Sequence, residues 1–147
     1  MYLHHMHVSF VLFADAANLS QEGKLNVLGV FDAVHAGQFP ALHPRATLVV
    51  RLKGNQSDVG VHPLTLRWVN GRGAELWSST VELTVAAPTG QSSEMDMPVI
   101  VQIDLPLDSP GDYRMQVELG GVRRSEAVLH VRGGAPTVPP SAGQLPS

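Results

Sequence analysis

The stretch FVLFADAANLSQEGKLNVLGVFD, residues 10–32, decides how the fold begins. An apolar run is followed by a polar segment, Asp15 to Lys24, and then by a second apolar run. Two short apolar segments joined by Asn, Ser and Gly are typical of a pair of strands and their connection. We therefore predict a β-hairpin-like unit whose loop spans residues 15–24.

A repeat of two residues governs the rest of the chain. Alternation of this kind places one face of each strand in a core and the other in water. Asn70-Gly71 and Gly120-Gly121 predict tight type I′ hairpin turns. We predict an all-β fold, a single antiparallel β-sandwich of about eight strands, immunoglobulin-like or C2-like. Apolar and polar residues alternate in six further segments, which are 48–52, 64–68, 81–85, 99–105, 113–119 and 127–131.

Tyr113 offers a finer indication of the architecture. It follows the turn sequence Ser109-Pro110-Gly111 and opens the penultimate predicted strand. In immunoglobulin-like sandwiches, a Tyr near the start of a late strand hydrogen-bonds back to the preceding corner. The alternative is an ordinary core Tyr with a solvated hydroxyl, and the sequence leaves both open.

The chain has enough residues for one domain with its own core. Of its 147 residues, 44% are hydrophobic and 16% are charged, which argues against disorder over most of the length. The alternation begins after Met6, so either residues 1–5 are a frayed extension or Met6 is the natural start. Residues 133–147 contain four prolines and no charge, which predicts a flexible, disordered tail. The sandwich domain is predicted to span residues 6–132.

Composition excludes several classes of function. The net charge is −3 and the basic residues are scattered, whereas a nucleic-acid binder carries a basic stripe. The chain has no cysteine, which excludes disulfides, thiolate nucleophiles, zinc–thiolate sites and iron–sulfur clusters. No segment approaches the roughly 18 apolar residues of a membrane span, and no Lys or Arg precedes Lys24 as an export signal requires. We expect a soluble, cytoplasmic protein that binds neither nucleic acid nor membrane.

Catalytic motifs are missing from the sequence. It contains no G-x-S-x-G nucleophile elbow, no S-x-x-K and no phosphate-binding loop, so we expect neither an enzyme nor a cofactor. An enzyme hypothesis would pair Asp15 with Lys24 across the predicted loop. We favour the alternative, in which Asp15 and Asn18 bond loop N–H groups while Lys24 and Asp32 bound the second strand.

Three aspartates raise the question of a calcium site. Asp104, Asp108 and Asp112 recur every four residues, and sandwiches of the C2 type hold calcium with loop aspartates. Calcium requires six to eight oxygens, usually from several converging loops. Pro106 and Pro110 interrupt the run, so we favour ordinary turn chemistry and predict no metal site.

Several motifs together resemble a known family. They are ADAANLSQEGKLNVLGVFDAV from residue 14, Phe39-Pro40, LVVRL at 48–52, and Pro110-Gly111 with Tyr113. This combination is similar to a family of short bacterial proteins known only as a domain of unknown function. The resemblance spans residues 6–131, implies a β-sandwich and carries over no catalytic residue. Its N-terminal signature includes Asp15, Asn18, Lys24 and Asp32.

The sequence favours a non-catalytic module that binds another protein or a second copy of itself. Its first predicted strand is apolar on both faces, so one face is available to a partner. The alternative is that this strand is buried twice within its own domain. A loop-end module for a ligand or calcium, and an enzyme of unrecognised type, are the remaining hypotheses. The candidate interaction residues are Val8, Phe10, Val11, Leu12 and Phe13.

Overall fold

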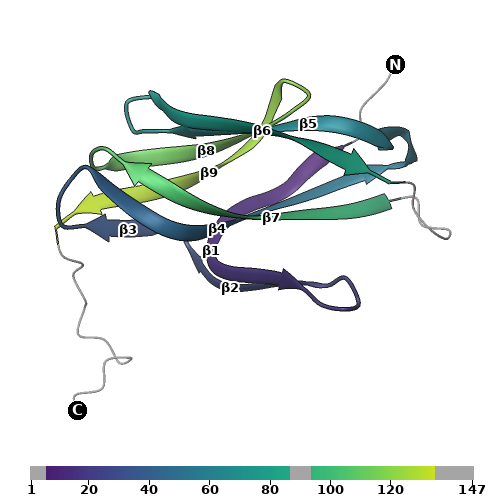
Figure 1. The fold of residues 1–147 in the computed structure, drawn as a ribbon, viewed down its shortest axis with the longest axis horizontal. Coiled ribbons are helices and arrows are strands. Elements are labelled where there is room, and N and C mark those ends of the chain that lie inside the picture. Colours follow the sequence, from purple (N-terminus) through teal and green to yellow (C-terminus); the bar gives the residue numbers. More distant parts are fainter. Residues whose placement is uncertain (1–5, 87–93, 135–147) are drawn as a thin grey trace, which may run out of the picture.

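The computed structural model describes residues 6–86 and 94–134 (Figure 1). The predicted extension 1–5 and most of the predicted tail lie outside these residues. Within them the fold is all-β, as predicted, and no helix has the length and apolar character to cross a membrane. The elements are β1 (His7–Leu19), β2 (Leu25–Phe31), β3 (Ala33–Ala36), β4 (Ala41–Asn55), the 3-10 turn η1 (Gln56–Asp58), β5 (Gly60–Val69), β6 (Glu75–Val85), β7 (Glu94–Leu107), β8 (Gly111–Leu119) and β9 (Val122–Gly133).

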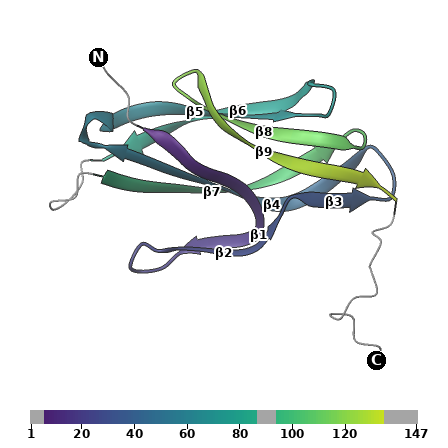
Figure 2. The same cartoon turned by 180° about the vertical axis from the view of Figure 1, so that it is seen from behind.

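The strands form two sheets that enclose one core (Figures 1 and 2). The four-stranded sheet has the order β2-β1-β4-β7, and the five-stranded sheet has the order β3-β9-β8-β5-β6. The prediction of a purely antiparallel sandwich is wrong at one place, because β3 runs parallel to β9. The chain changes sheets at Asp32, between β2 and β3, and this crossing delivers β3 in the same direction as β9. The carbonyl of Asp32 accepts the N–H of His130 at 2.7 Å and fixes the crossing.

Alternating residues supply the core, as the period of two predicts. The inward rows of β4, β5 and β8 are almost fully buried, and each large apolar side chain removed from water contributes about 1.5–3 kcal/mol. Trp68 joins the sheets, because its indole N–H donates to the carbonyl of Pro106 on β7 at 2.8 Å. Val49 departs from the pattern, since it is fully buried although it lies on the opposite face of β4.

One hairpin turn agrees with its prediction and one does not. Gly120 and Gly121 both have positive φ, 60° and 82°, as a two-residue type I′ turn requires. At the other turn the positive φ, 85°, belongs to Gly73, whose N–H donates to the carbonyl of Asn70. The side-chain oxygen of Asn70 accepts two further backbone N–H groups, so Asn70 closes a longer turn instead of occupying its centre.

The first hairpin is longer than predicted. β1 continues to Leu19, so the first half of the predicted loop over 15–24 is strand, and the turn occupies Ser20 to Lys24. β1 pairs with β4 up to Ala14 and with β2 from Phe13 onward. This change of partner lets the β1–β2 hairpin project from the body of the sandwich (Figures 1 and 2).

Candidate functional site

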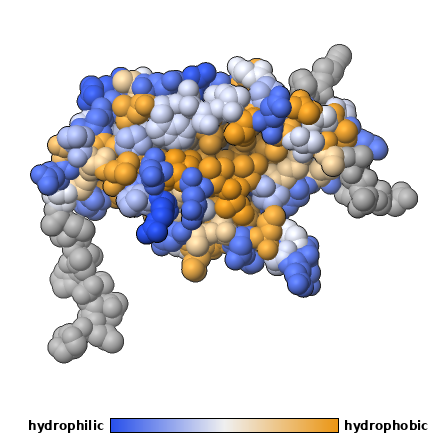
Figure 3. All heavy atoms as spheres, in the orientation of Figure 1, coloured by the Kyte–Doolittle hydropathy of each residue, from blue (hydrophilic) through white to orange (hydrophobic). Residues whose placement is uncertain are grey.

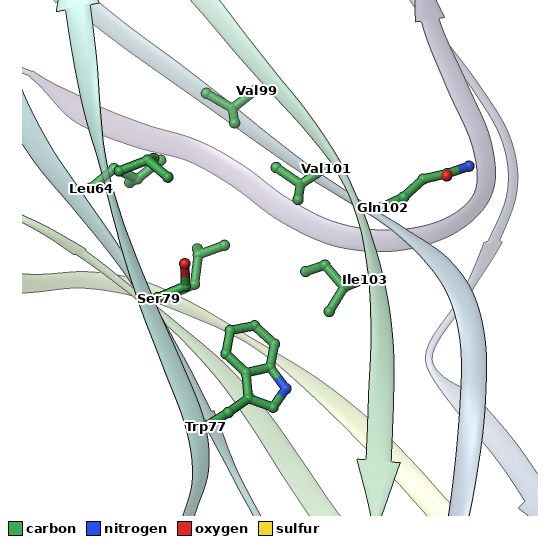
Figure 4. A pocket seen from close by; sticks show the side chains of 9 residues that line it. Leu64, Trp77, Ser79, Val99, Val101, Gln102 and Ile103 are labelled. Carbon is green, nitrogen blue, oxygen red and sulfur yellow. The ribbon is translucent and has the colours of Figure 1, made fainter.

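An apolar groove runs along one side of the sandwich, between β6 and β7. These are the last strands of the two sheets on that side. The groove has a volume of about 240 Å³, and Figure 3 shows apolar surface gathered along this side of the molecule. In Figure 4, Val99, Val101 and Ile103 of β7 point toward Trp77 and Ser79 of β6, whereas Gln102 points away.

The groove exists because the five-stranded sheet extends farther than the sheet that covers it. Leu64 of β5 is only 1% exposed, but Val81, its neighbour in the β5–β6 ladder, is 52% exposed. Both side chains point inward, so the cover supplied by the facing sheet ends between β5 and β6. Among the described residues that line the groove, Ser79 and Gln102 are polar and none is ionisable. It therefore suits an apolar side chain better than a reacting substrate.

The edge strand beside the groove is only lightly protected against strand addition, by one irregularity near its start and by the exposed charge of Glu82. Within residues 6–86 and 94–134 the sheets have four edges, and the other three are short or are interrupted within the strand by Pro or Gly. β7 contains Pro98 and Pro106, β3 has only four residues, and β2 contains Gly29 at a φ of 72°. β6 has one irregularity near its start, and from Trp77 to Val85 it pairs regularly with β5 and contains neither Pro nor Gly.

The predicted interaction strand is mostly enclosed. In the ladder with β4, Val8, Val11 and Phe13 lie on the core face, and Phe13 is 1% exposed. Phe10 and Leu12 lie on the outer face and are half-buried beside the fully buried Val49. The first strand is thus covered to a large extent on both faces, and the groove leaves more apolar surface open.

The signature residues shape the β1–β2 hairpin. The carboxylate of Asp15 packs onto Gly29, so closely that a Cβ at Gly29 would lie 2.3 Å from Oδ2. The amide of Asn26 donates to the side-chain oxygen of Asn18 at 3.0 Å. Asn18 therefore bonds a side chain across two strands and not a loop N–H group as expected, because residues 15–19 are strand.

The other two signature residues lie apart from this contact. Lys24 forms an ion pair with Glu22 at 3.6 Å, and both side chains are about three-quarters exposed. The Asp15–Lys24 pair that an enzyme hypothesis needs is not among the ion pairs within the described residues. Asp32 marks the crossing between sheets through its backbone carbonyl. These residues direct the chain and do not converge on a common site.

Tyr113 closes the corner between β7 and β8. Its hydroxyl oxygen accepts the N–H groups of Asp108 and Ser109 at 2.9 and 3.0 Å. Its proton reaches either Oδ1 of Asp108 or the carbonyl of Ser109, each 2.6 Å away. The ring is fully buried against Trp68, and burial raises the pKa of Tyr113. The hydrogen bond from Tyr113, assisted by Asn70 and Arg72, lowers the pKa of Asp108 to about 2.

The three aspartates of the calcium hypothesis have separate partners. Asp104 accepts the backbone N–H of Arg45 at 2.9 Å, and Asp108 lies at the β7–β8 corner beside the hydroxyl of Tyr113. Asp112 accepts a hydrogen bond from His130 at 2.8 Å, which lowers the pKa of that carboxyl. Across residues 6–86 and 94–134, no three His, Asp or Glu side chains are grouped as metal ligands would be.

The chain matches the model of a protein family over most of its length. The model of a family of unknown function, DUF6941, matches residues 9–132, from the third residue of β1 to the second-last residue of β9. The chain belongs to the DUF6941 family. The resemblance found in its motifs is thereby confirmed. No curated protein matches the chain.

The groove was not predicted from the sequence of this DUF6941 chain. The alternation at 81–85 indicated a strand, but the strand begins at Glu75 and includes Trp77 and Ser79. Alternation that starts at residue 77 would have indicated which face of this strand points inward, because the alternate residues are mostly apolar. These residues are Trp77, Ser79, Val81, Leu83 and Val85. That this strand is an edge depends on the order of the strands, which alternation alone does not reveal.

Proposed function

We propose that this DUF6941 chain is a non-catalytic protein-binding module that takes up an extended segment along β6. The observation that carries the proposal is the regular edge from Trp77 to Val85, free of Pro and Gly, beside an apolar groove. An added strand would obtain affinity from main-chain hydrogen bonds and specificity from alternate side chains that enter the groove.

The size of the groove favours side chains over a complete small ligand. At about 240 Å³ it lies below the usual range of ligand pockets, about 300–1,000 Å³. Its walls of Leu64, Val99 and Val101 would accept Val-, Ile- or Leu-sized groups. A strand places a side chain on the same face at every second residue. We therefore expect binding segments with apolar residues at alternate positions.

Selection from a random peptide display library tests this proposal. The immobilised chain should enrich peptides with alternating apolar residues. Val81→Lys places an ammonium group at the groove, so it should weaken the binding of a selected peptide about tenfold or more. Val61→Lys is the matched control, because Val61 is 57% exposed but lies on the other face of the same sheet. Selection without such a pattern, or equal binding by the two variants, would contradict the proposal.

We also infer that the fold is immunoglobulin-like. Immunoglobulin constant domains place strands A, B and E in one sheet and G, F and C in the other, and variable domains extend the second sheet with C′. The order β1-β4-β7 against β9-β8-β5-β6 fits that arrangement. The buried Trp68 on the strand equivalent to C, and Tyr113 at the start of the strand equivalent to F, support it. In this alignment β6 is equivalent to C′.

A further inference from the structure

We propose that a second copy of the chain occupies the β6 edge, antiparallel to the first, about a two-fold axis through Thr80. This inference rests on the proposed function and names its partner. β6 spans 11 residues, Glu75 to Val85, and Thr80 is its midpoint. Pairing Thr80 with Thr80 therefore gives the register in which the two strands overlap along their whole length. An interface of this kind is self-complementary, as a two-fold dimer requires.

The inward row of β6 fits this register. Trp77 would lie opposite Leu83 of the second copy, and Ser79 opposite Val81. Two-fold symmetry repeats each pair, so apolar or small residues meet at all inward positions from Trp77 to Leu83. Val81 is 52% exposed in the single chain. The second β6 strand would lie about 4.8 Å beyond the first, with its inward side chains over the mouth of the groove.

The charged residues on the outer face of β6 are also compatible with this register. Glu82 would lie opposite Ser78 of the second copy, so no two carboxylates face each other. Ser78 is the ladder partner of Arg67 on β5. The guanidinium of Arg67 donates to Glu118 at 2.8 Å and to Glu75 at 2.7 Å on this outer face. Arg67 is thus already paired within its own chain, and the register satisfies only the condition that like charges do not lie directly opposite each other, which would destabilise the pair.

The other long edge of the groove is less suitable for a second copy. β7 contains Pro98 and Pro106, which have no N–H to donate to a neighbouring strand. β6 has no proline and continues regularly from Trp77 to Val85. The self-association is therefore assigned to β6, with β7 forming the far wall of the groove.

A cysteine trap tests the register directly, because the natural chain contains no cysteine. Directly opposed residues of antiparallel strands have Cα atoms about 4.5–5.5 Å apart, which a disulfide can span. Thr80→Cys should therefore form a covalent dimer under mild oxidation. Thr84→Cys is the matched control, since Thr84 is exposed on the same face of the same strand. In the proposed dimer the two Thr84 residues would lie about 26 Å apart, so this variant should remain uncrosslinked.

Light scattering of the unmodified chain over a dilution series supplies the second readout. The expected mass of the natural chain is twice its monomer mass of 15.7 kDa. Val81→Lys should be monomeric and Val61→Lys should remain dimeric. Circular dichroism verifies that both variants are folded. A monomer at every concentration would overturn the inference, as would a dimer that persists in Val81→Lys. Equal crosslinking of Thr80→Cys and Thr84→Cys would overturn it as well. A monomer that still selects alternating peptides would overturn only the identity of the partner, whereas failure of both experiments would overturn the proposed function too.

Discussion

Tyr113 shows how one side chain holds a corner of this fold. Its hydroxyl satisfies two backbone N–H groups, those of Asp108 and Ser109, and bonds the carboxylate of Asp108. Buried donors without an acceptor are costly. The corner therefore depends on an oxygen atom that a purely apolar side chain cannot supply.

Tyr113→Phe should lower the free energy of unfolding by about 1–3 kcal/mol, because it preserves the ring and leaves the two N–H groups without their acceptor. Urea denaturation followed by tryptophan fluorescence measures the change. A loss below about 0.5 kcal/mol, the range of ordinary surface substitutions, would show that the hydroxyl is not needed at the corner.

Gly29→Ala should destabilise the fold through a clash and through backbone strain. The new Cβ would lie 2.3 Å from Oδ2 of Asp15, at a φ of 72°. In an Asp15→Ala background the clash is reduced and the strain remains, so the cost of Gly29→Ala should fall by about 1 kcal/mol in a double-mutant cycle. Strictly additive costs would mean that Asp15 and Gly29 are not coupled.

These residues also mark a limit of inference from sequence. We expected Asp15 and Asn18 to bond N–H groups of a loop, because polar residues of this kind between two apolar runs usually do so. Their actual partners, Gly29 and Asn26, lie across a hairpin whose length depends on where β1 ends. Tyr113 was easier to place, because its partners are only four and five residues away.

The β7–β8 corner gives the fold an acid-sensitive element. The pKa of Asp108 is depressed to about 2, first of all by the hydrogen bond from Tyr113. A carboxyl with a depressed folded-state pKa contributes stability above its unfolded pKa, about 3.9, and this contribution is lost as the pH falls toward 2. Asp108→Asn should therefore be less stable than the natural chain at neutral pH, and the difference should shrink between pH 4 and pH 2. Thermal unfolding across this range measures it, and a difference that does not change with pH would contradict this role of Asp108.

Strands were predictable as elements, and their neighbours were not. The alternation at 48–52, 64–68 and 113–119 identified core rows that are buried in the fold. The parallel pairing of β3 with β9, and the edge position of β6, depend on contacts between distant parts of the chain. The same limit applies to the candidate site. The groove lies between the edge strands of the two sheets, so its position depends on the order of the strands in each sheet.

At the scale of the whole molecule, Trp68 connects the two sheets. It packs on Tyr113 at 5.2 Å and on Phe13 at 5.9 Å between ring centres, and its N–H reaches β7. Trp68→Ala should cost about 3–5 kcal/mol, because it leaves a cavity where both sheets meet. Unfolding monitored by circular dichroism would show this loss, and a change below 1 kcal/mol would mean that the core does not depend on this contact.

The difference in width between the two sheets is the property of the whole molecule that matters most for function. The five-stranded sheet ends in a strand with no proline, and the facing sheet leaves its inward row partly uncovered. An uncovered apolar row beside free N–H and C=O groups favours pairing with another strand.

The most direct test of strand binding at β6 is a nuclear magnetic resonance titration of the isotopically labelled chain with a selected alternating peptide. We expect the amide shifts to concentrate in Trp77–Leu83, and the methyl shifts in Val99, Val101 and Ile103. Displacement of a second copy by the peptide would change the same signals. Shifts confined to the β1–β2 hairpin or to the Asp104–Asp112 corner, with β6 unaffected, would contradict the proposal.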